Sequence, residues 1–126
     1  MILSRGTMTE KESPILKKSY AFALRIVRLY KFLCDEQHEY ILSKEALVNG
    51  TAIGAHVKAA QEAGSKDGFL HEMSLALQRA TKTEYWLELL RDGKFLDTNA
   101  FDSIHTDWEE IKKMLTAIVR TSKGLQ

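Results

Sequence analysis

The sequence predicts an all-α protein built as an antiparallel up-down four-helix bundle. The chain has 126 residues, a length that suits one domain, and with one proline and seven glycines it favours long helices over many short strands. Apolar residues recur at helical spacing in four segments. Because the connections between these segments are short, consecutive helices should run antiparallel.

The expected domain organisation is a flexible tail over residues 1–13, the bundle over residues 14–122 and a short tail over residues 123–126. Pro14 suits the first turn of a helix, where a missing N–H costs no hydrogen bond. The first helix is predicted over residues 15–34. Its apolar residues cover about half of its circumference, which is wider than one bundle core requires. They are Leu16, Tyr20, Phe22, Ala23, Ile26, Val27, Leu29, Tyr30, Leu33 and Cys34.

The second helix is predicted over residues 39–63, with Gly50 and Gly54 on its apolar face. A glycine inside a helix costs roughly 1 kcal/mol relative to alanine. We therefore expect a close approach of another backbone or a slight bend here, and a dimer face is the alternative. Gly64 suits a C-terminal cap, and Ser65 suits the N-cap of the next helix.

The third helix is predicted over residues 66–91 and the fourth up to residue 121, with N-cap candidates at residues 97–99. The third has a core stripe and, on its far side, the apolar residues Leu75, Trp86 and Leu89. In the fourth helix, apolar residues recur at alternating spacings of four and three, a pattern typical of a bundle seam. They are Ile104, Trp108, Ile111, Leu115 and Ile118.

Composition excludes several classes of protein. Lys and Arg total 18 and Asp and Glu 17, so the net charge of +1 does not predict a dominant nucleic-acid or membrane field. Cys34 is the single cysteine, which excludes an intrachain disulfide. The sequence has no apolar run of signal-peptide or membrane-spanning length. We therefore expect a cytoplasmic protein with no membrane partner.

Two groups of residues are candidates for chemistry. Asp35 and His38, with Asp102 and His105, mimic the carboxylate-x-x-His pattern of di-iron bundles, but the further core carboxylates are not visible. Solvated loop and cap residues are the favoured interpretation. Glu84 falls on the core stripe of the third helix, where pairing with Lys or Arg is favoured over a catalytic acid. We expect no catalytic residue, no cofactor and no metal, and hence no enzyme.

Two surfaces remain as candidates for binding. The wide apolar face of the first helix and the set Leu75, Trp86 and Leu89 are too apolar to stay exposed, so they predict self-association through these residues. A basic surface could instead bind the phosphates of nucleic acid, although a solvated charged face is the simpler interpretation. Its members are Lys17, Lys18, Arg25, Arg28, Lys31, Arg79 and Lys82.

Two stretches of the chain are specific enough to indicate a family. They are Gly-Thr-Ala-Ile-Gly-Ala at residues 50–55 and Thr-Glu-Tyr-Trp-Leu at residues 83–87. With Met-Ser-Leu-Ala-Leu at 73–77 and Ile-x-x-Met-Leu at 111–115, they resemble the bacterial four helix bundle proteins encoded in intervening sequences of 23S rRNA genes. The accessory protein of diversity-generating retroelements is similar as well. The resemblance covers roughly residues 20–121.

This resemblance implies a bundle that forms homo-oligomers, commonly ring-like pentamers, without enzymatic activity. It also implies binding of nucleic acid or of a reverse transcriptase as a second partner class. His56 stands where the family usually has Asn, Ala59 where an acidic residue is common, and Lys82 where Glu is frequent. A polar contact between that Asn and Glu would be missing or rebuilt in this chain.

The expected function is therefore that of a non-enzymatic, homo-oligomeric scaffold or adaptor. The alternative is a nucleic-acid-binding accessory protein that acts with a ribonucleoprotein or a reverse transcriptase.

Overall fold

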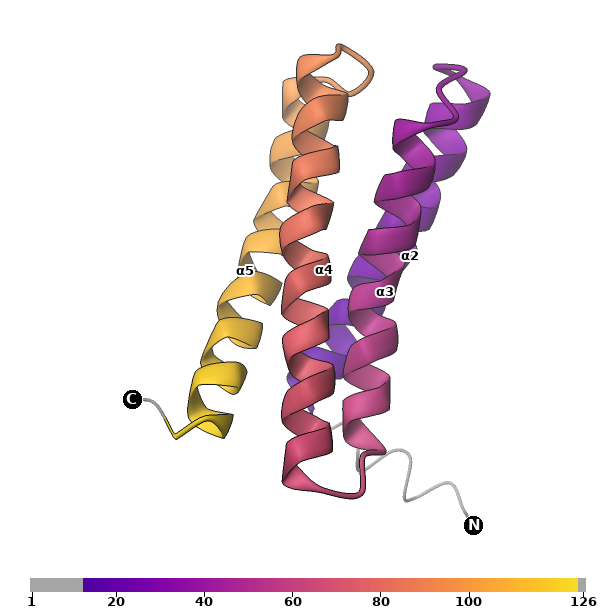
Figure 1. The fold of residues 1–126 in the computed structure, drawn as a ribbon. Coiled ribbons are helices and arrows are strands. Elements are labelled where there is room, and N and C mark those ends of the chain that lie inside the picture. Colours follow the sequence, from indigo (N-terminus) through magenta and orange to yellow (C-terminus); the bar gives the residue numbers. More distant parts are fainter. Residues whose placement is uncertain (1–12, 125–126) are drawn as a thin grey trace.

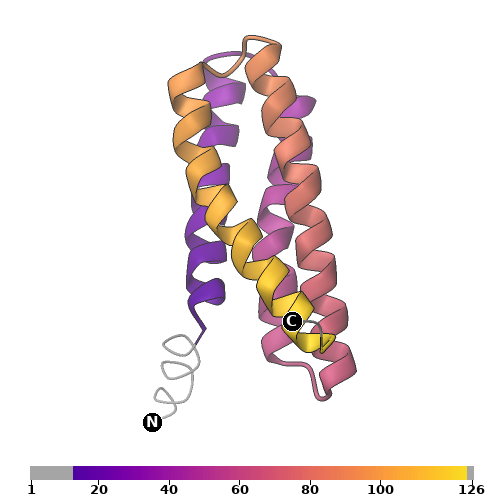
Figure 2. The same ribbon diagram turned by 90° about the vertical axis from the view of Figure 1, so that its left-hand side faces the viewer.

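The computed structural model describes residues 13–124, which form four helices and no strand. The helices are α2 (Pro14–Asp35), α3 (Leu42–Gln61), α4 (Lys66–Asp92) and α5 (Thr98–Ser122). They run up and down as an antiparallel bundle, with the α2–α3 and α4–α5 connections at one end (Figures 1 and 2). Helix α3 packs against α2 and α4, and α5 packs against α4 and α2, so α3 and α5 lie diagonally. This confirms the predicted fold. None of the four helices is long and apolar enough to cross a membrane.

The core is formed by the predicted apolar stripes. On α5, Ile104, Trp108, Ile111 and Leu115 are all buried, which confirms the seam. The seam extends to Phe101 at one end and Val119 at the other, whereas Ile118 is only half-buried. The other helices contribute Phe22, Ile26, Leu33, Ile53, Val57, Met73, Leu87 and Leu90, among others. Every buried side-chain nitrogen and oxygen of the described chain has a hydrogen-bond partner.

Capping residues explain where two of the helices begin. Ser65 Oγ accepts a hydrogen bond of 3.0 Å from the Gly68 N–H, and an Asp97 carboxylate oxygen accepts one of 2.8 Å from the Ala100 N–H. These bonds satisfy N–H groups that the first turn of a helix leaves free. Pro14 is the first residue of α2, as predicted. Ser13, which was assigned to the tail, is buried at the N-cap position, and the rest of that predicted tail lies outside the described residues.

Helix α3 differs from its prediction at both ends. It begins at Leu42 rather than at residue 39, because the Glu39 carboxylate caps its first turn. Glu39 oxygens accept hydrogen bonds from the N–H groups of Ile41, Leu42 and Ser43 at 2.7–3.1 Å. The helix ends at Gln61, with Glu62 at the C-cap position. The expected capping role of Gly64 was therefore wrong.

The two glycines of α3 lie against α2, and the expected close backbone approach is found at one of them. A Cβ atom at Gly54 would lie 3.4 Å from the backbone oxygen of Ser19, which confirms the close backbone approach. A Cβ atom at Gly50 would lie only 2.8 Å from Cγ1 of Ile26, a core side chain that is 1% exposed. A Cβ atom at Gly50 would therefore clash with a core side chain, whereas one at Gly54 would only contact the α2 backbone.

This difference predicts opposite effects of alanine at the two positions. Gly50→Ala should lower the free energy of unfolding by about 1–2 kcal/mol, because overpacking at Ile26 outweighs a helix-propensity gain of about 1 kcal/mol. Gly54→Ala adds a methyl group at ordinary contact distance and should leave stability unchanged or raised by up to about 1 kcal/mol. Urea denaturation followed by circular dichroism measures both. Equal stability of the two variants would contradict the clash at Ile26.

Candidate interaction surface

Large apolar side chains are exposed along the outer sides of α2 and α3. On α2, Tyr20 is 65% exposed, Leu24 40% and Val27 38%, and their spacing of four and three places them on one face. Val48 of α3 is 45% exposed, and Ile41, just before that helix, is 76% exposed. Single exposed apolar residues are ordinary, but a row of them on neighbouring helices makes this a candidate interaction surface.

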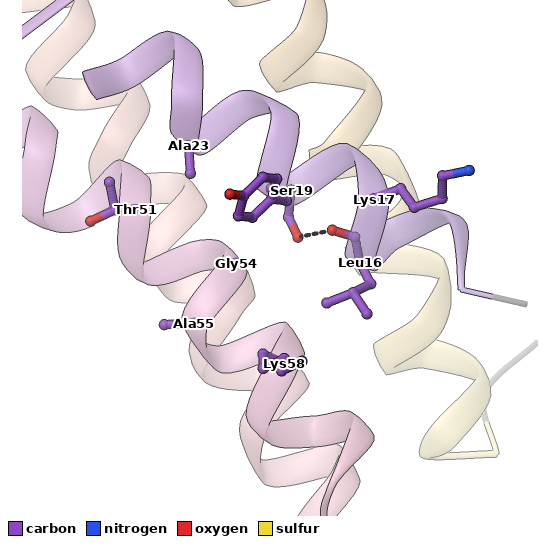
Figure 3. A pocket seen from close by; sticks show the side chains of 9 residues that line it. Leu16, Lys17, Ser19, Ala23, Thr51, Gly54, Ala55 and Lys58 are labelled. Carbon is purple, nitrogen blue, oxygen red and sulfur yellow. Dashed lines mark hydrogen bonds between the residues drawn. The ribbon is translucent and has the colours of Figure 1, made fainter. Parts of the chain in front are cut away.

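A groove of about 690 Å³ lies between these two helices along part of that surface (Figure 3). Its floor is made of small side chains because Gly54 lets α3 approach the backbone of Ser19. Lys17 and Lys58 border it, both exposed, and neither forms an ion pair within residues 13–124. The complete lining is Leu16, Lys17, Ser19, Tyr20, Ala23, Thr51, Gly54, Ala55 and Lys58. We call this surface, with Leu24, Val27 and Val48, the α2–α3 face.

Part of this face comes from the wide apolar side that the sequence predicts for the first helix. Tyr20 and Val27, which the sequence placed on the apolar side, are exposed rather than buried. Periodicity does not identify Leu24 and Val48, since each lies outside the apolar stripe of its own helix. Their role appears once α2 and α3 are placed side by side.

The other predicted contact set, Leu75, Trp86 and Leu89, is half-buried on α4. Trp86 packs against the core, and its ring meets the more exposed ring of Tyr85 edge to face, with 5.1 Å between centroids. This set is therefore less exposed than the α2–α3 face, and its part in subunit contacts stays a prediction.

The predicted basic surface is divided between different roles. Lys18 pairs with Glu110 at 3.1 Å, and Arg25 pairs with Asp107 at 2.8 Å, so both connect α2 to α5. Arg25 also donates a hydrogen bond of 2.9 Å to the hydroxyl of Ser103. None of the remaining members forms an ion pair in the described chain. Arg79 is half-buried, and the others are exposed; these are Lys17, Arg28, Lys31 and Lys82. Binding of nucleic acid there stays a prediction.

The two histidines of the predicted carboxylate-x-x-His pattern contact other side chains. His105 Nε2 lies 2.8 Å from the Glu84 carboxylate, and His38 Nδ1 lies 3.3 Å from the Tyr40 hydroxyl. Glu84 is thus at the edge of the core with a partner on a neighbouring helix, but that partner is a histidine rather than Lys or Arg. Across residues 13–124, no three His, Cys, Asp or Glu side chains are grouped so that they could hold a metal ion.

Cys34, near the end of α2, is half-buried. A hydrogen bond with Cys34, one helical turn away, raises the pKa of the Tyr30 hydroxyl, and the charge of the thiolate adds to this effect.

Comparison with known proteins agrees with this fold. The family model described as 23S rRNA-intervening sequence protein matches residues 11–117. The chain belongs to this family. A crystal structure of a protein of unknown function from the S23 ribosomal protein family of Bacteroides thetaiotaomicron is 43% identical and superposes with a TM-score of 0.83. The match covers 84% of this chain and 98% of that one. Among curated proteins, none matches the chain.

One departure from the pattern of the 23S rRNA-intervening sequence proteins has a structural counterpart. His56 Nδ1 lies 2.8 Å from a Glu72 carboxylate oxygen, which links α3 to α4. A polar contact is therefore present at His56, the position where the resemblance described above implies Asn. Ala59 and Lys82 are exposed and have no comparable contact among the described residues.

Proposed function

We propose that this chain is a non-enzymatic, homo-oligomeric scaffold or adaptor whose subunits contact one another through the α2–α3 face. The observation that carries the proposal is the row of exposed apolar side chains on that face. Monomeric soluble proteins rarely leave a contiguous apolar patch larger than a few hundred Å² in water. Burial of Tyr20, Leu24 and Val48 against another subunit would remove this surface from solvent.

The chemistry of the groove supports binding rather than catalysis. Its nine lining residues contribute two hydroxyl groups from Ser19 and Thr51, one phenol from Tyr20 and the two lysines at its edge. The Ser19 hydroxyl donates to the Leu16 backbone oxygen at 3.2 Å and the Thr51 hydroxyl to the Leu47 oxygen at 2.7 Å. The lining contains no carboxylate, imidazole or thiol that could activate these hydroxyls as nucleophiles. An apolar floor with few polar groups is typical of a surface that receives side chains of another protein.

The family resemblance makes a ring of five subunits the expected assembly. A ring requires a heterologous contact, in which two different surfaces of the subunit meet. The α2–α3 face is one such surface, since its bordering lysines would repel the same lysines of a second copy placed directly opposite. Light scattering on a sizing column gives the mass, and a multiple near five chains of 14.4 kDa is expected. The mass of one chain would overturn the proposal.

A charge on the α2–α3 face should dissociate the assembly. Val27→Glu and Val48→Glu each place a carboxylate on an exposed position, so the folded subunit tolerates them while the buried interface does not. We expect the mass to fall toward one chain with unchanged helical content. Tyr40→Glu, in the α2–α3 connection at the end of the bundle, is the matched control and should retain the wild-type mass. Wild-type mass for both valine variants would exclude this face.

A further inference from the structure

Arg79 is held in position by a buried amide. Asn49, on α3, is 4% exposed, and its Oδ1 accepts a hydrogen bond of 3.0 Å from Nη1 of Arg79 on α4. The amide is fixed in turn, because its Nδ2 donates to the backbone oxygen of Glu45 at 2.9 Å. Within the described part of the chain, no carboxylate lies at ion-pair distance from Arg79. The guanidinium is therefore oriented without an acidic partner of its own.

The surroundings of Arg79 have the composition of an interface centre. Leu75, Arg79, Lys82 and Trp86 follow one another at spacings of four, three and four, so they share one side of α4. Leu75 and Trp86 are half-buried, and Lys82 is exposed. Arginine and tryptophan dominate the energetically important positions of protein interfaces. A planar guanidinium held in this way suits a carboxylate of the binding partner.

The height of Arg79 along the bundle indicates which carboxylate of a second copy can reach it. Trp108 Nε1 of α5 donates a hydrogen bond of 2.8 Å to the oxygen of Ala80, the residue after Arg79, so the Trp108 indole reaches α4 within the same helical turn as Arg79. Glu109 follows Trp108 and is exposed. Its acidic neighbours are engaged within the subunit, Asp107 by Arg25 and Glu110 by Lys18. Among the three α5 carboxylates next to Trp108, Glu109 is therefore the one without an ion pair in the described chain.

We propose that Arg79 of one subunit binds the Glu109 carboxylate of a second copy of this chain. The two residues lie on different sides of the bundle, since Asn49 of α3 orients Arg79 whereas Glu109 belongs to α5, the diagonal helix. Such a contact is heterologous, because two different surfaces of the subunit meet. In a ring whose axis is parallel to the helices, it joins residues at the same position along that axis. The attraction between the opposite charges fixes how the two surfaces align with each other. This inference rests on the proposed self-association.

Charge reversal tests the pair directly. Arg79→Glu and Glu109→Lys should each shift the particle to smaller species by light scattering, because like charges then meet in the contact. The double variant Arg79→Glu/Glu109→Lys restores an opposite pair and should recover the wild-type mass. Lys66→Glu is the matched control, since it reverses an exposed charge at the start of the same helix, about 20 Å along the helix axis from Arg79, and it should retain the wild-type mass. Circular dichroism confirms that each variant is folded.

Arg79→Lys separates charge from geometry. It keeps the positive charge but loses the planar fork that binds a carboxylate through two N–H groups. We expect partial dissociation, between the wild-type and the Arg79→Glu results. This variant also preserves a donor for Asn49, so a loss of mass with intact helical content supports the contact rather than a folding defect.

The outcomes distinguish this inference from the proposed function. A wild-type protein with the mass of one chain would overturn both. An oligomer that retains its mass after both single reversals would overturn the pairing of Arg79 with Glu109 while self-association stands. Dissociation by each single variant without recovery in the double variant would also overturn the pairing, because the two residues would then act separately.

Discussion

Trp108→Ala is expected to lower the free energy of unfolding by about 3–5 kcal/mol, the range for truncating a buried tryptophan. Trp108 is 5% exposed, and its indole fills the core between α4 and α5. Its ring stacks on His105 with 4.8 Å between centroids, and its Nε1 donates to the Ala80 oxygen at 2.8 Å. The variant loses apolar burial and this hydrogen bond and leaves a cavity. Since native domains are stable by only about 5–15 kcal/mol, it should be close to unfolding.

The two tryptophans of the chain provide an internal comparison. Trp86 is half-buried on the outer side of α4, so Trp86→Ala should cost clearly less than Trp108→Ala in the same urea titration. Trp108→Phe retains most of the apolar contact and loses the N–H donor, and it should cost about 1 kcal/mol for the hydrogen bond. Circular dichroism is the suitable probe because each variant removes a fluorophore. Equal losses for the two alanine variants would contradict the central position of Trp108.

The arrangement of the core could be predicted from the sequence because helical periodicity is local. Ile104, Trp108 and Ile111 repeat at spacings of four and three, and a helix with that repeat has to bury them together. A second local signal predicted a close backbone approach at Gly54, since a glycine inside a helix is typical of one, and the structure shows that this backbone is α2. These predictions require no knowledge of which helix faces which.

The candidate surface depends on pairings that a single helix does not encode. Arg25 and Asp107 are 82 positions apart, and Glu84 meets His105 on a neighbouring helix. Tyr20 reads as a core residue in isolation, yet it is exposed because α2 turns Phe22 and Ile26 inward. The orientation of Arg79 by Asn49 depends likewise on the register of α3 against α4. The sequence supplied the chemistry of these side chains, and the packing of the helices decided which of them remain free.

The start of α3 shows how a local pattern can mislead. Glutamate is a good helix former, so Glu39 extends the helical pattern of the residues after it. In the structure this residue precedes the helix, and its carboxylate bonds to three backbone N–H groups of the first turn. Ser43 Oγ completes the cap by donating to the Glu39 backbone oxygen at 2.7 Å. A carboxylate in this position also interacts favourably with the helix dipole.

Glu39→Ala should therefore lower the free energy of unfolding by about 2 kcal/mol at pH 7, because hydrogen bonds to a charged group are lost and a buried N–H of Ser43 is left without its acceptor. Glu39→Gln is the milder variant, since its amide offers one acceptor oxygen rather than two, and it should lose roughly half as much. Urea denaturation at neutral pH ranks the three proteins. A Glu39→Ala protein as stable as wild type would exclude the capping role.

The same contacts predict how this contribution depends on pH. Burial of Glu39 opposes its ionisation, but the hydrogen bonds from Leu42, Ser43 and Ile41 outweigh burial, so the pKa of the carboxyl lies below its ordinary value. A group with a lowered folded-state pKa stabilises the fold above its unfolded-state pKa, about 4.3 for glutamate, and loses this effect as the pH falls through the folded-state value. The stability difference between wild type and Glu39→Ala should thus stay constant from pH 7 to about pH 5 and shrink below about pH 4. A difference that persists unchanged in acid would mean that shape, rather than the charge of Glu39, stabilises the start of α3.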